Sequence, residues 1–177
     1  QPRDDEILVR VQAASINPVD YKIRTGQSAK REQLPIMLGR DVSGTVARCG
    51  TQVRDWEEGD EVFAMLPPER GGYAEYVTIK ASQSALKPTK LDHEHAAAVP
   101  LAGLTAWQGL FEHGQLKAGQ RVLIHGAAGG VGHFAVQLAK AAGAAEVIAT
   151  ATSDDAQFLR KLGADRIIDY RSQPFED

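Results

Sequence analysis

The amino-acid sequence predicts a β-rich domain followed by an α/β domain, because the hydrophobic period of the chain changes near residue 92. Before that point, short segments alternate between apolar and polar residues and are separated by turn-forming residues, which is typical of a small, partly open β-barrel. After it, strand and helix patterns follow one another, as in a doubly wound parallel sheet. A glycine-rich turn, residues 126–132, joins a strand to a helix in this second part.

The first part contains four expected strands and one short helical turn. Residues 6–13 alternate with Ile7, Val9 and Val11 on one face, which indicates a half-buried strand. Further strands are expected at residues 41–49, 61–65 and 73–79, and a helical turn over residues 17–26 begins with Asn-Pro and stops at a glycine. We therefore assign residues 1–98 to the β domain.

The second part begins with an alanine-rich helical segment in which Pro100 marks a break or a new helix start. Beyond it we expect strands at residues 122–125, 147–151 and 166–168, and helices at residues 130–142 and 154–162. Val131, Phe134 and Leu138 belong to one apolar stripe of the first helix, which predicts packing on a sheet. Residues 99–177 are assigned to this domain.

Composition excludes several classes of protein. The chain is 43% hydrophobic and 24% charged with a net charge of −3, so no basic excess is available for a nucleic-acid partner. No stretch approaches a membrane span, and the polar N-terminal residues do not resemble a signal peptide. The one cysteine, Cys49, rules out an intramolecular disulfide and a multi-cysteine metal site, which predicts a reducing, cytoplasmic setting.

The glycine turn predicts a dinucleotide site. Ala127, Gly129 and Gly132 fit the pattern G-x-G-x-x-G with alanine in the first place, between an expected strand and an expected helix. Gly129 would let the backbone approach a diphosphate, and Gly132 would let the helix pack closely on the strand. The expected cofactor contacts here are Ala128, Gly129, Gly130, Val131 and Gly132. A turn that serves packing alone is the alternative.

Residues after the second expected strand favour NADP(H) over NAD(H). A site for NAD(H) normally has an acidic residue there to hold the ribose hydroxyls, whereas this sequence has Thr150, Thr152 and Ser153. Small hydroxyl side chains leave room for a 2′-phosphate. Ser153 is also suited to cap the following helix, and Asp154 is close enough to turn toward the ribose, so NAD(H) remains the alternative.

Seven stretches that cover nearly the whole chain resemble one protein family. They are EILVRVQAASINPVD, GRDVSGTV, GDEVFAM, GGYAEYV, LAGLTAW, GAAGGVG and LGADRIIDYR, and they occur in the family's order. The sequence thus resembles the zinc-independent quinone oxidoreductases of the medium-chain dehydrogenase/reductase superfamily, the group that includes zeta-crystallin. The resemblance implies a GroES-like catalytic domain without its N-terminal strand, then the first half of a Rossmann NAD(P)-binding domain, with the active site between them. It also implies a chain truncated at both ends and a homodimer at full length.

The resemblance also implies that no metal is bound. Zinc-dependent relatives take ligands from positions that correspond here to Asn17, Arg40 and the pair Pro100-Leu101, and arginine is no zinc ligand. Cys49 lies off the pattern. His93 and His95 are expected to be solvated, and the remaining histidines to be structural.

Site residues follow from the resemblance one by one. Asn17, Asp20 and Tyr21 are expected to line the substrate site, and Thr105, at a helix start, to contact the nicotinamide or its ribose. Tyr170 corresponds to a tyrosine beside the 2′-phosphate. Asn17 alternatively forms a turn before a proline, and Tyr21 alternatively serves packing. Ala156 stands where many relatives have a phosphate-binding lysine.

The expected function is therefore NADPH-dependent transfer of hydride, without zinc, to a quinone or an α,β-unsaturated carbonyl. Such acceptors are already electron-poor, so hydrogen-bond donors suffice to stabilise the oxygen on which charge develops. An enoyl-thioester reductase is an alternative enzyme on the same fold. A non-catalytic protein that binds NADPH for a regulatory or structural purpose is the alternative from another class.

Overall fold

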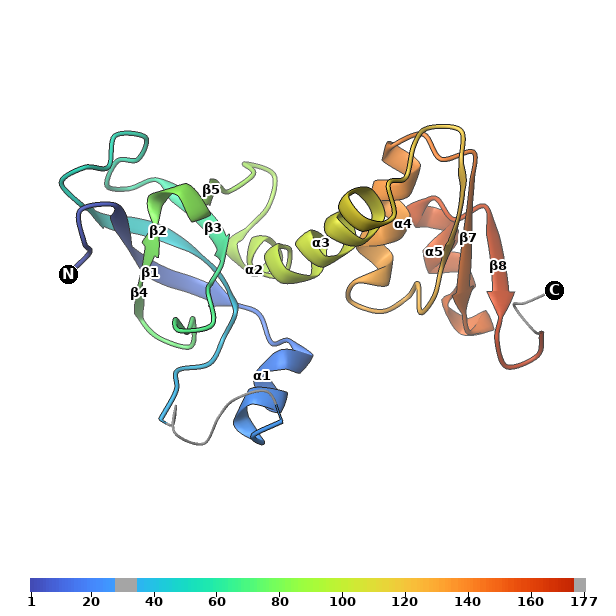
Figure 1. Ribbon diagram of the computed structural model, residues 1–177, viewed down its shortest axis with the longest axis horizontal. Helices are drawn as coiled ribbons and strands as arrows, with labels where there is room; N and C mark the ends of the chain where they lie inside the picture. Colours follow the sequence, from blue (N-terminus) through green and yellow to red (C-terminus); the bar gives the residue numbers. More distant parts are fainter. Residues whose placement is uncertain (28–34, 174–177) are drawn as a thin grey trace. The chain divides into compact units, whose positions relative to one another are not determined.

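The computed structural model describes residues 1–27 and 35–173 of the 177-residue chain, which forms two compact units, Gln1–Leu101 and Ala102–Asp177 (Figure 1). The division between these units lies within helix α3 (Pro100–Trp107). One continuous helix thus contributes its first residues to the first unit and the remainder to the second.

The first unit is built on a five-stranded antiparallel sheet in the order β4-β1-β2-β3-β5, as the sequence predicts for the first part of the chain. Its strands are β1 (Glu6–Ala14), β2 (Asp41–Cys49), β3 (Glu61–Met65), β4 (Tyr76–Lys80) and β5 (Ala85–Leu86). Gly44 of β2 lies opposite Val11, and a Cβ there would be only 2.9 Å from Val9 Cγ1, so the two longest strands approach closely only at a glycine.

Alternating apolar residues of these strands form the core of the first unit. Ile7, Val9, Val42, Val62 and Ile79 have almost no exposed surface. Three short helical segments accompany the sheet: α1 (Pro18–Arg24), η2 (Ala81–Gln83) and α2 (His93–Ala97).

Strand β4 begins at Tyr76, three residues after the expected start at Tyr73. The Tyr73 backbone N–H donates to Leu38 O at 3.0 Å instead of joining the β1–β4 ladder, and its hydroxyl donates to Asp20. Contacts with residues distant in sequence therefore shorten this strand, although the alternating pattern extends further.

The expectation that His93 is solvated is wrong. Its side chain is only 18% exposed, with Nδ1 2.8 Å from Ser43 Oγ and Nε2 3.1 Å from Glu61 Oε1. Helix α2 packs over β1, β2 and β3, which places the first histidine of the helix against the sheet. His95 follows two residues later on the outer side, and its side chain is 74% exposed.

The second unit contains a parallel sheet in the order β6-β7-β8, and the predicted alternation of strand and helix is confirmed. The strands are β6 (Arg121–Ile124), β7 (Glu146–Ala151) and β8 (Arg166–Asp169), connected by α4 (Gly132–Ala141), the short η4 (Ser153–Asp155) and α5 (Ala156–Leu162). A π-helical segment, η3 (Gln108–His113), continues from α3. Gly163, at φ 109°, ends α5 in a left-handed conformation that favours glycine.

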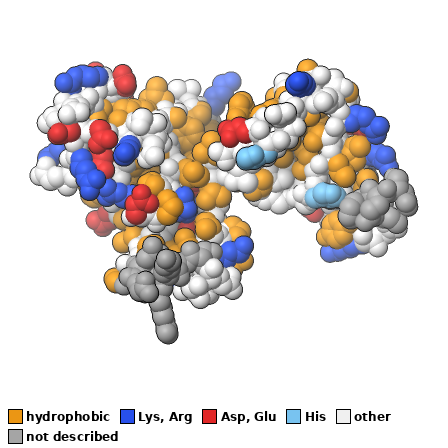
Figure 2. All heavy atoms as spheres, in the orientation of Figure 1, with side chains coloured by type: hydrophobic (Ala, Val, Ile, Leu, Met, Phe, Trp, Pro, Cys, Tyr) orange, Lys and Arg blue, Asp and Glu red, His pale blue; other side chains and the backbone are white. Residues whose placement is uncertain are grey.

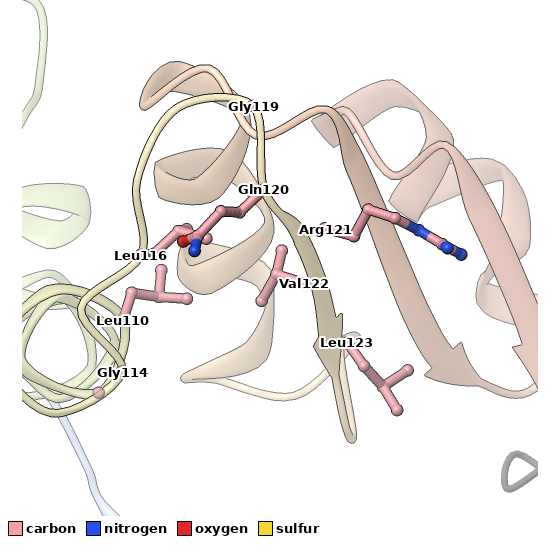
Figure 3. A pocket seen from close by; sticks show the side chains of 9 residues that line it. Leu110, Gly114, Leu116, Gly119, Gln120, Arg121, Val122 and Leu123 are labelled. Carbon is pink, nitrogen blue, oxygen red and sulfur yellow. The ribbon is translucent and has the colours of Figure 1, made fainter.

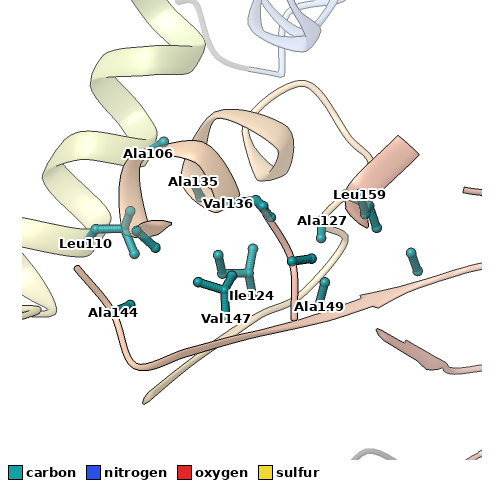
Figure 4. Close-up of a cluster of buried hydrophobic side chains, with 13 residues drawn as sticks. Ala106, Leu110, Ile124, Ala127, Ala135, Val136, Ala144, Val147, Ala149 and Leu159 are labelled. Atoms are coloured by element: carbon teal, nitrogen blue, oxygen red, sulfur yellow. The ribbon is translucent and has the colours of Figure 1, made fainter. Parts of the chain in front are cut away.

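Helix α4 packs its small side chains against the strands (Figure 4). Val136 and Ala139 are fully buried, as are Val147 and Ala149 of β7. Because alanine occupies so many of these positions, the helix lies close to the sheet, and the loop between β6 and α4 must turn sharply.

Charged residues of both signs are interspersed on the face of the first unit seen in Figure 2. Among the residues that the structure describes, no helix combines the length and apolar character that a bilayer crossing needs.

Candidate active site and cofactor-binding turn

A group of hydrogen-bonded polar side chains lies where β1, α1 and β2 meet in the first unit. We call Ser15, Asn17, Asp20, Asp41 and Tyr73 the polar cluster. The carboxylate of Asp41 is completely buried and accepts at Oδ2 from Ser15 Oγ (2.7 Å) and Asn17 Nδ2 (2.8 Å). Its other oxygen accepts from the Leu101 backbone N–H at 2.9 Å. Asp41 thus ties the end of β1 to the first turn of α3.

The second carboxylate of the polar cluster, Asp20, is only 3% exposed. Its Oδ2 accepts from the Asn17 backbone N–H at 2.8 Å and from the Tyr73 hydroxyl at 3.0 Å, and its Oδ1 accepts from the Gly39 N–H at 3.1 Å. With three donors already in place, Asp20 holds the start of α1 and the chain around Gly39 together.

Burial sets the protonation behaviour of the cluster. Desolvation raises the pKa of Asp41, although the hydrogen bonds from Ser15 and Asn17 oppose the shift. Burial, followed by the hydrogen bond to Asp20, raises the pKa of Tyr73 to about 12. The Tyr73 hydroxyl is therefore a hydrogen-bond donor that stays protonated at neutral pH.

The sequence-predicted residues Asn17 and Asp20 are brought together in this cluster, whereas Tyr21 is half exposed. Tyr73 was missed because its surroundings suggested an ordinary strand, and no local signal links it to a residue 53 positions earlier. Thr105 is exposed in the second unit, but it is the sixth residue of α3 rather than the helix start, because the helix already begins at Pro100.

The glycine turn of the second unit leaves part of its backbone uncovered. A Cβ at Gly130 would meet nothing within 4 Å, and one at Gly129 would meet only Gly126 O at 3.2 Å. A Cβ at Gly132 would instead clash with Gly126 O and lie 2.6 Å from Ala127 Cα. Gly132 is thus needed for close packing of α4, while Gly129 and Gly130 border open space.

Helix α4 begins at Gly132, two residues later than predicted, with Val131 preceding it. At the start of this ten-residue helix the His133 and Ala135 N–H groups already donate to Gly129 O at 3.1 Å and Val131 O at 3.0 Å, so an anion there would meet the backbone of the turn itself, around Gly130 to Gly132. The Val131 side chain is 38% exposed, and Ala128 is partly buried.

Thr150 is buried beneath the turn rather than exposed to a ribose. It is 3% exposed, its Oγ1 accepts from the Gly126 N–H at 3.2 Å, and its carbonyl accepts from the Ala127 N–H at 3.0 Å. Thr150 therefore fixes the conformation of the turn from the neighbouring strand.

A hydrogen bond within the loop that follows β7 and another from this loop to the end of β8 order the carboxyl ends of the two strands. Thr152 Oγ1 donates to Asp155 Oδ2 at 2.9 Å, and the Ser153 N–H donates to Asp169 Oδ2 at 3.0 Å. Tyr170 comes next and is 52% exposed. Polar groups predicted to meet the ribose thus lie together at the carboxyl ends of the strands, where parallel sheets bind ligands.

A hollow of about 680 Å³ lies beside β6, but in a different place (Figure 3). Leu110, Leu116 and Val122 line it, together with the turn that precedes β6. It therefore borders the chain entering the strand, whereas the glycine turn follows the carboxyl end of β6. The hollow and the exposed backbone of the turn thus lie at opposite ends of β6.

Comparison with known proteins agrees with this geometry. The family described as "Alcohol dehydrogenase GroES-like domain" matches residues 3–90, and the family described as "Zinc-binding dehydrogenase" matches residues 130–177. The chain is 43% identical over 95% of its length to "NAD(P)H oxidoreductase RTN4IP1, mitochondrial" from Bos taurus, covering 47% of that protein. It is 41% identical over 99% of its length to "NADPH-dependent alkenal/one oxidoreductase, chloroplastic" from Arabidopsis thaliana, again covering 47%.

A solved structure of Escherichia coli quinone oxidoreductase complexed with NADPH matches 98% of this chain and 53% of its own, with 36% identity and a TM-score of 0.86. The chain belongs to the zeta-crystallin-like family of the medium-chain dehydrogenase/reductase superfamily. Its two units are accordingly a GroES-like sheet and part of a Rossmann fold, as the resemblance implied. It spans about half the length of the curated relatives it matches.

The family that matches residues 130–177 is described as zinc-binding, but the residues at the ligand positions of this chain make other contacts. Asn17 donates its amide to Asp41, and Arg40 Nε donates to Leu66 O at 2.7 Å. Across residues 1–27 and 35–173, no three His, Cys, Asp or Glu side chains gather closely enough to hold a metal ion. A guanidinium and an amide at the ligand positions do not fit zinc.

The expectation of a cytoplasmic protein is wrong for this branch of the family. The relatives reported above are named mitochondrial and chloroplastic. A single cysteine excludes a disulfide framework, but it does not distinguish one reducing compartment from another.

Proposed function

We propose that the full-length protein is an NADPH-dependent oxidoreductase that transfers hydride to quinones or α,β-unsaturated carbonyls without zinc. One observation carries the proposal: the glycine turn exposes its backbone at Gly129 and Gly130 but is closed by packing at Gly132. That combination suits a diphosphate lying against the start of α4. The names of the relatives, which include an NADPH-dependent alkenal/one oxidoreductase, support the same chemistry.

In this proposal the second unit holds the dinucleotide. The diphosphate would lie against the backbone of the turn, at the positive end of the α4 dipole. The residues that surround it are Ala128, Gly129, Gly130, Val131 and Gly132. On the adjoining loops, Thr152, Ser153 and Tyr170 meet the adenosine ribose and its 2′-phosphate, and Thr150 supports the turn from below. Thr105 is assigned to the nicotinamide end.

Residues of the first unit serve the acceptor. Bound reduced nicotinamide supplies a hydride to an electron-poor double bond or quinone. The donors nearest in kind to those that stabilise a developing oxyanion are the Asn17 amide, which donates to Asp41 and Ser15, and the protonated Tyr73 hydroxyl, which donates to Asp20. Either group would exchange one of these bonds for a bond to the oxyanion. Asp20 orients Asn17 and Tyr73, and Tyr21, being half exposed, is assigned to the wall of the substrate site.

Independence from zinc is part of the proposal. Its support is the identity of the residues at the ligand positions, where Asn17 and Arg40 are both committed to hydrogen bonds within the chain. The acceptor must then be reactive without a Lewis acid, which favours quinones and enones over simple ketones and alcohols.

The test is NADPH oxidation by the full-length protein with phenanthrenequinone, a naphthoquinone and a simple enone, each with and without a metal chelator. We expect turnover of at least one acceptor and no effect of the chelator. NADPH binding without turnover would favour the regulatory or structural role, and turnover confined to enoyl thioesters would favour that alternative enzyme.

The placement of the diphosphate has its own test, Gly129→Val. The side chain would occupy the open space above the turn, so we expect loss of NADPH binding by calorimetry with little change in melting temperature. Unchanged binding in this variant would contradict the assignment.

The homodimer implied by the family remains a prediction. Light scattering on the full-length protein would measure its mass directly.

A further inference from the structure

The preference for NADPH was predicted because no acidic residue ends β7, yet the fold brings one there from another strand. Asp169 is the last residue of β8 and pairs with Ala151, the last residue of β7. Its Oδ2 accepts from the Ser153 N–H at 3.0 Å. A carboxylate therefore lies against the segment that follows the second strand, which is where the adenosine ribose binds in this type of fold.

The Asp169 carboxylate is held in place and ionised. Its Oδ1 accepts from the Arg171 N–H at 3.0 Å, and this bond, together with the one from Ser153, lowers the pKa of Asp169. The backbone carbonyl of Asp169 also accepts from the N–H of Ser172 at 3.0 Å, so the residue is fixed by its own turn. A full negative charge at neutral pH is thus part of the site.

Other charges nearby act on the same position. Asp155 lies on the next turn and accepts from Thr152 Oγ1 at 2.9 Å, so that hydroxyl is directed at a carboxylate. The Arg171 guanidinium is the nearby positive charge and contributes to the lowered pKa of Asp169. A 2′-phosphate would compete with Asp169 for this arginine and would be repelled by the carboxylate itself.

We propose that Asp169 is a specificity-determining residue that limits how strongly the site prefers NADPH over NADH. The inference rests on the proposed function, because it assumes that a nicotinamide dinucleotide binds at the glycine turn. The Asp169 carboxylate repels the 2′-phosphate of NADPH, whereas the free 2′-hydroxyl of NADH can donate a hydrogen bond to it. Removing its charge should strengthen NADPH binding relative to NADH.

The test compares Asp169→Asn with Asp169→Glu in the full-length protein, by calorimetric titration with NADPH, NADH and 2′,5′-ADP. Asparagine keeps the size but loses the charge, and glutamate keeps the charge while changing the reach. We expect Asp169→Asn to raise the NADPH-to-NADH affinity ratio by about three- to tenfold at low ionic strength, with a smaller rise at high salt. Asp169→Glu should leave the ratio near the wild-type value.

Asp165→Asn is the matched control. Asp165 also has a lowered pKa and also accepts from a backbone N–H, that of Val147 at 2.9 Å, but it stands before β8, at the opposite end of the sheet. Its substitution should leave the affinity ratio unchanged. A ratio change as large as that of Asp169→Asn would overturn the inference, because the effect would then not depend on position.

Asp169→Asn also loses one hydrogen bond, which will loosen the loop. This loosening should weaken the binding of NADPH and NADH equally, so the ratio of their affinities reports the effect of the charge alone. An NADPH-to-NADH affinity ratio that stays at the wild-type value in Asp169→Asn would overturn the role of Asp169 while leaving the proposed function in place. A wild-type protein that binds neither dinucleotide would overturn the proposed function as well.

Discussion

The polar cluster of the first unit and the glycine turn of the second are held in place by different means. In the cluster, the buried carboxylates of Asp20 and Asp41 each accept hydrogen bonds from three donors, and all but the Asn17 N–H bound to Asp20 come from distant parts of the chain. In the turn, the backbone itself is the functional surface, and side chains are kept away from it. The cluster therefore depends on side chains that are present, and the turn depends on a side chain that is absent at Gly132.

The two regions also differ in how they respond to pH. Burial raises the pKa of Asp41, whereas hydrogen bonds from backbone amides lower the pKa of the partly exposed Asp169, which ends β8 in the same unit as the turn. A raised pKa favours the protonated form in the folded protein, and a lowered pKa favours the ionised form. Carboxylates of the two regions should therefore affect stability in opposite directions as pH changes.

The largest expected effect is that of Gly132→Val, which adds a side chain where the helix touches the turn. Its Cβ would lie 2.6 Å from Ala127 Cα, so α4 and the turn cannot both keep their positions. We expect a loss of about 3 kcal/mol or more in the free energy of unfolding, together with lost dinucleotide binding. Denaturant titration would measure the loss, and Gly130→Ala, at an open position, is the control.

Asp41→Asn is expected to have the next largest effect. The substitution replaces one buried carboxylate oxygen by an NH₂ group, which cannot accept the hydrogen bonds that the neighbouring groups donate. The cost should be about 1–3 kcal/mol at neutral pH, from a buried donor left unpaired. The pKa of Asp41 is raised above its usual 3.8 in the folded protein, so its contribution to stability is fully present below pH 3.8 and is lost as pH rises through the raised pKa.

The difference in unfolding free energy between wild type and Asp41→Asn should therefore shrink as pH rises from 3.8. Denaturant titration over a pH series would measure this trend. A difference that grows with pH would show that the hydrogen bonds from Ser15 and Asn17 outweigh desolvation.

Tyr73→Phe removes one donor to a carboxylate that keeps two others, so a loss of about 1 kcal/mol in stability is expected. In the wild type, ultraviolet titration should show one tyrosine ionising near pH 12, and the variant should lack it. Tyr76→Phe is the control, because Tyr76 is half exposed on β4. A variant whose titration matches the wild type would contradict the contact with Asp20.

Thr150→Val should have the smallest effect. The variant keeps the shape of the side chain but removes the hydroxyl that accepts from the Gly126 N–H at 3.2 Å, at a cost of about 0.5–1 kcal/mol. Dinucleotide affinity should fall a few-fold, since the turn is less well held, and calorimetry would measure it. An unaltered affinity would show that packing alone fixes the turn.

Much of the fold was predictable because its signals are local. Alternation identified β1, β2 and β3 with nearly the observed bounds, and the glycine pattern located the turn between β6 and α4. Prediction failed where distant contacts decide the outcome. Tyr73 lies outside strand β4 and its hydroxyl donates to Asp20. His93 packs against Ser43 instead of facing solvent.

The sequence by itself determined the order of strands and helices and the composition of the glycine turn, because hydrophobic period and backbone freedom depend on neighbours along the chain. Only the tertiary structure decided which charges meet. The sequence places no acid at the end of β7, but parallel pairing of β8 brings Asp169 to that point. Electrostatic surroundings depend on distance in space, and strand pairing sets that distance between residues far apart in the chain.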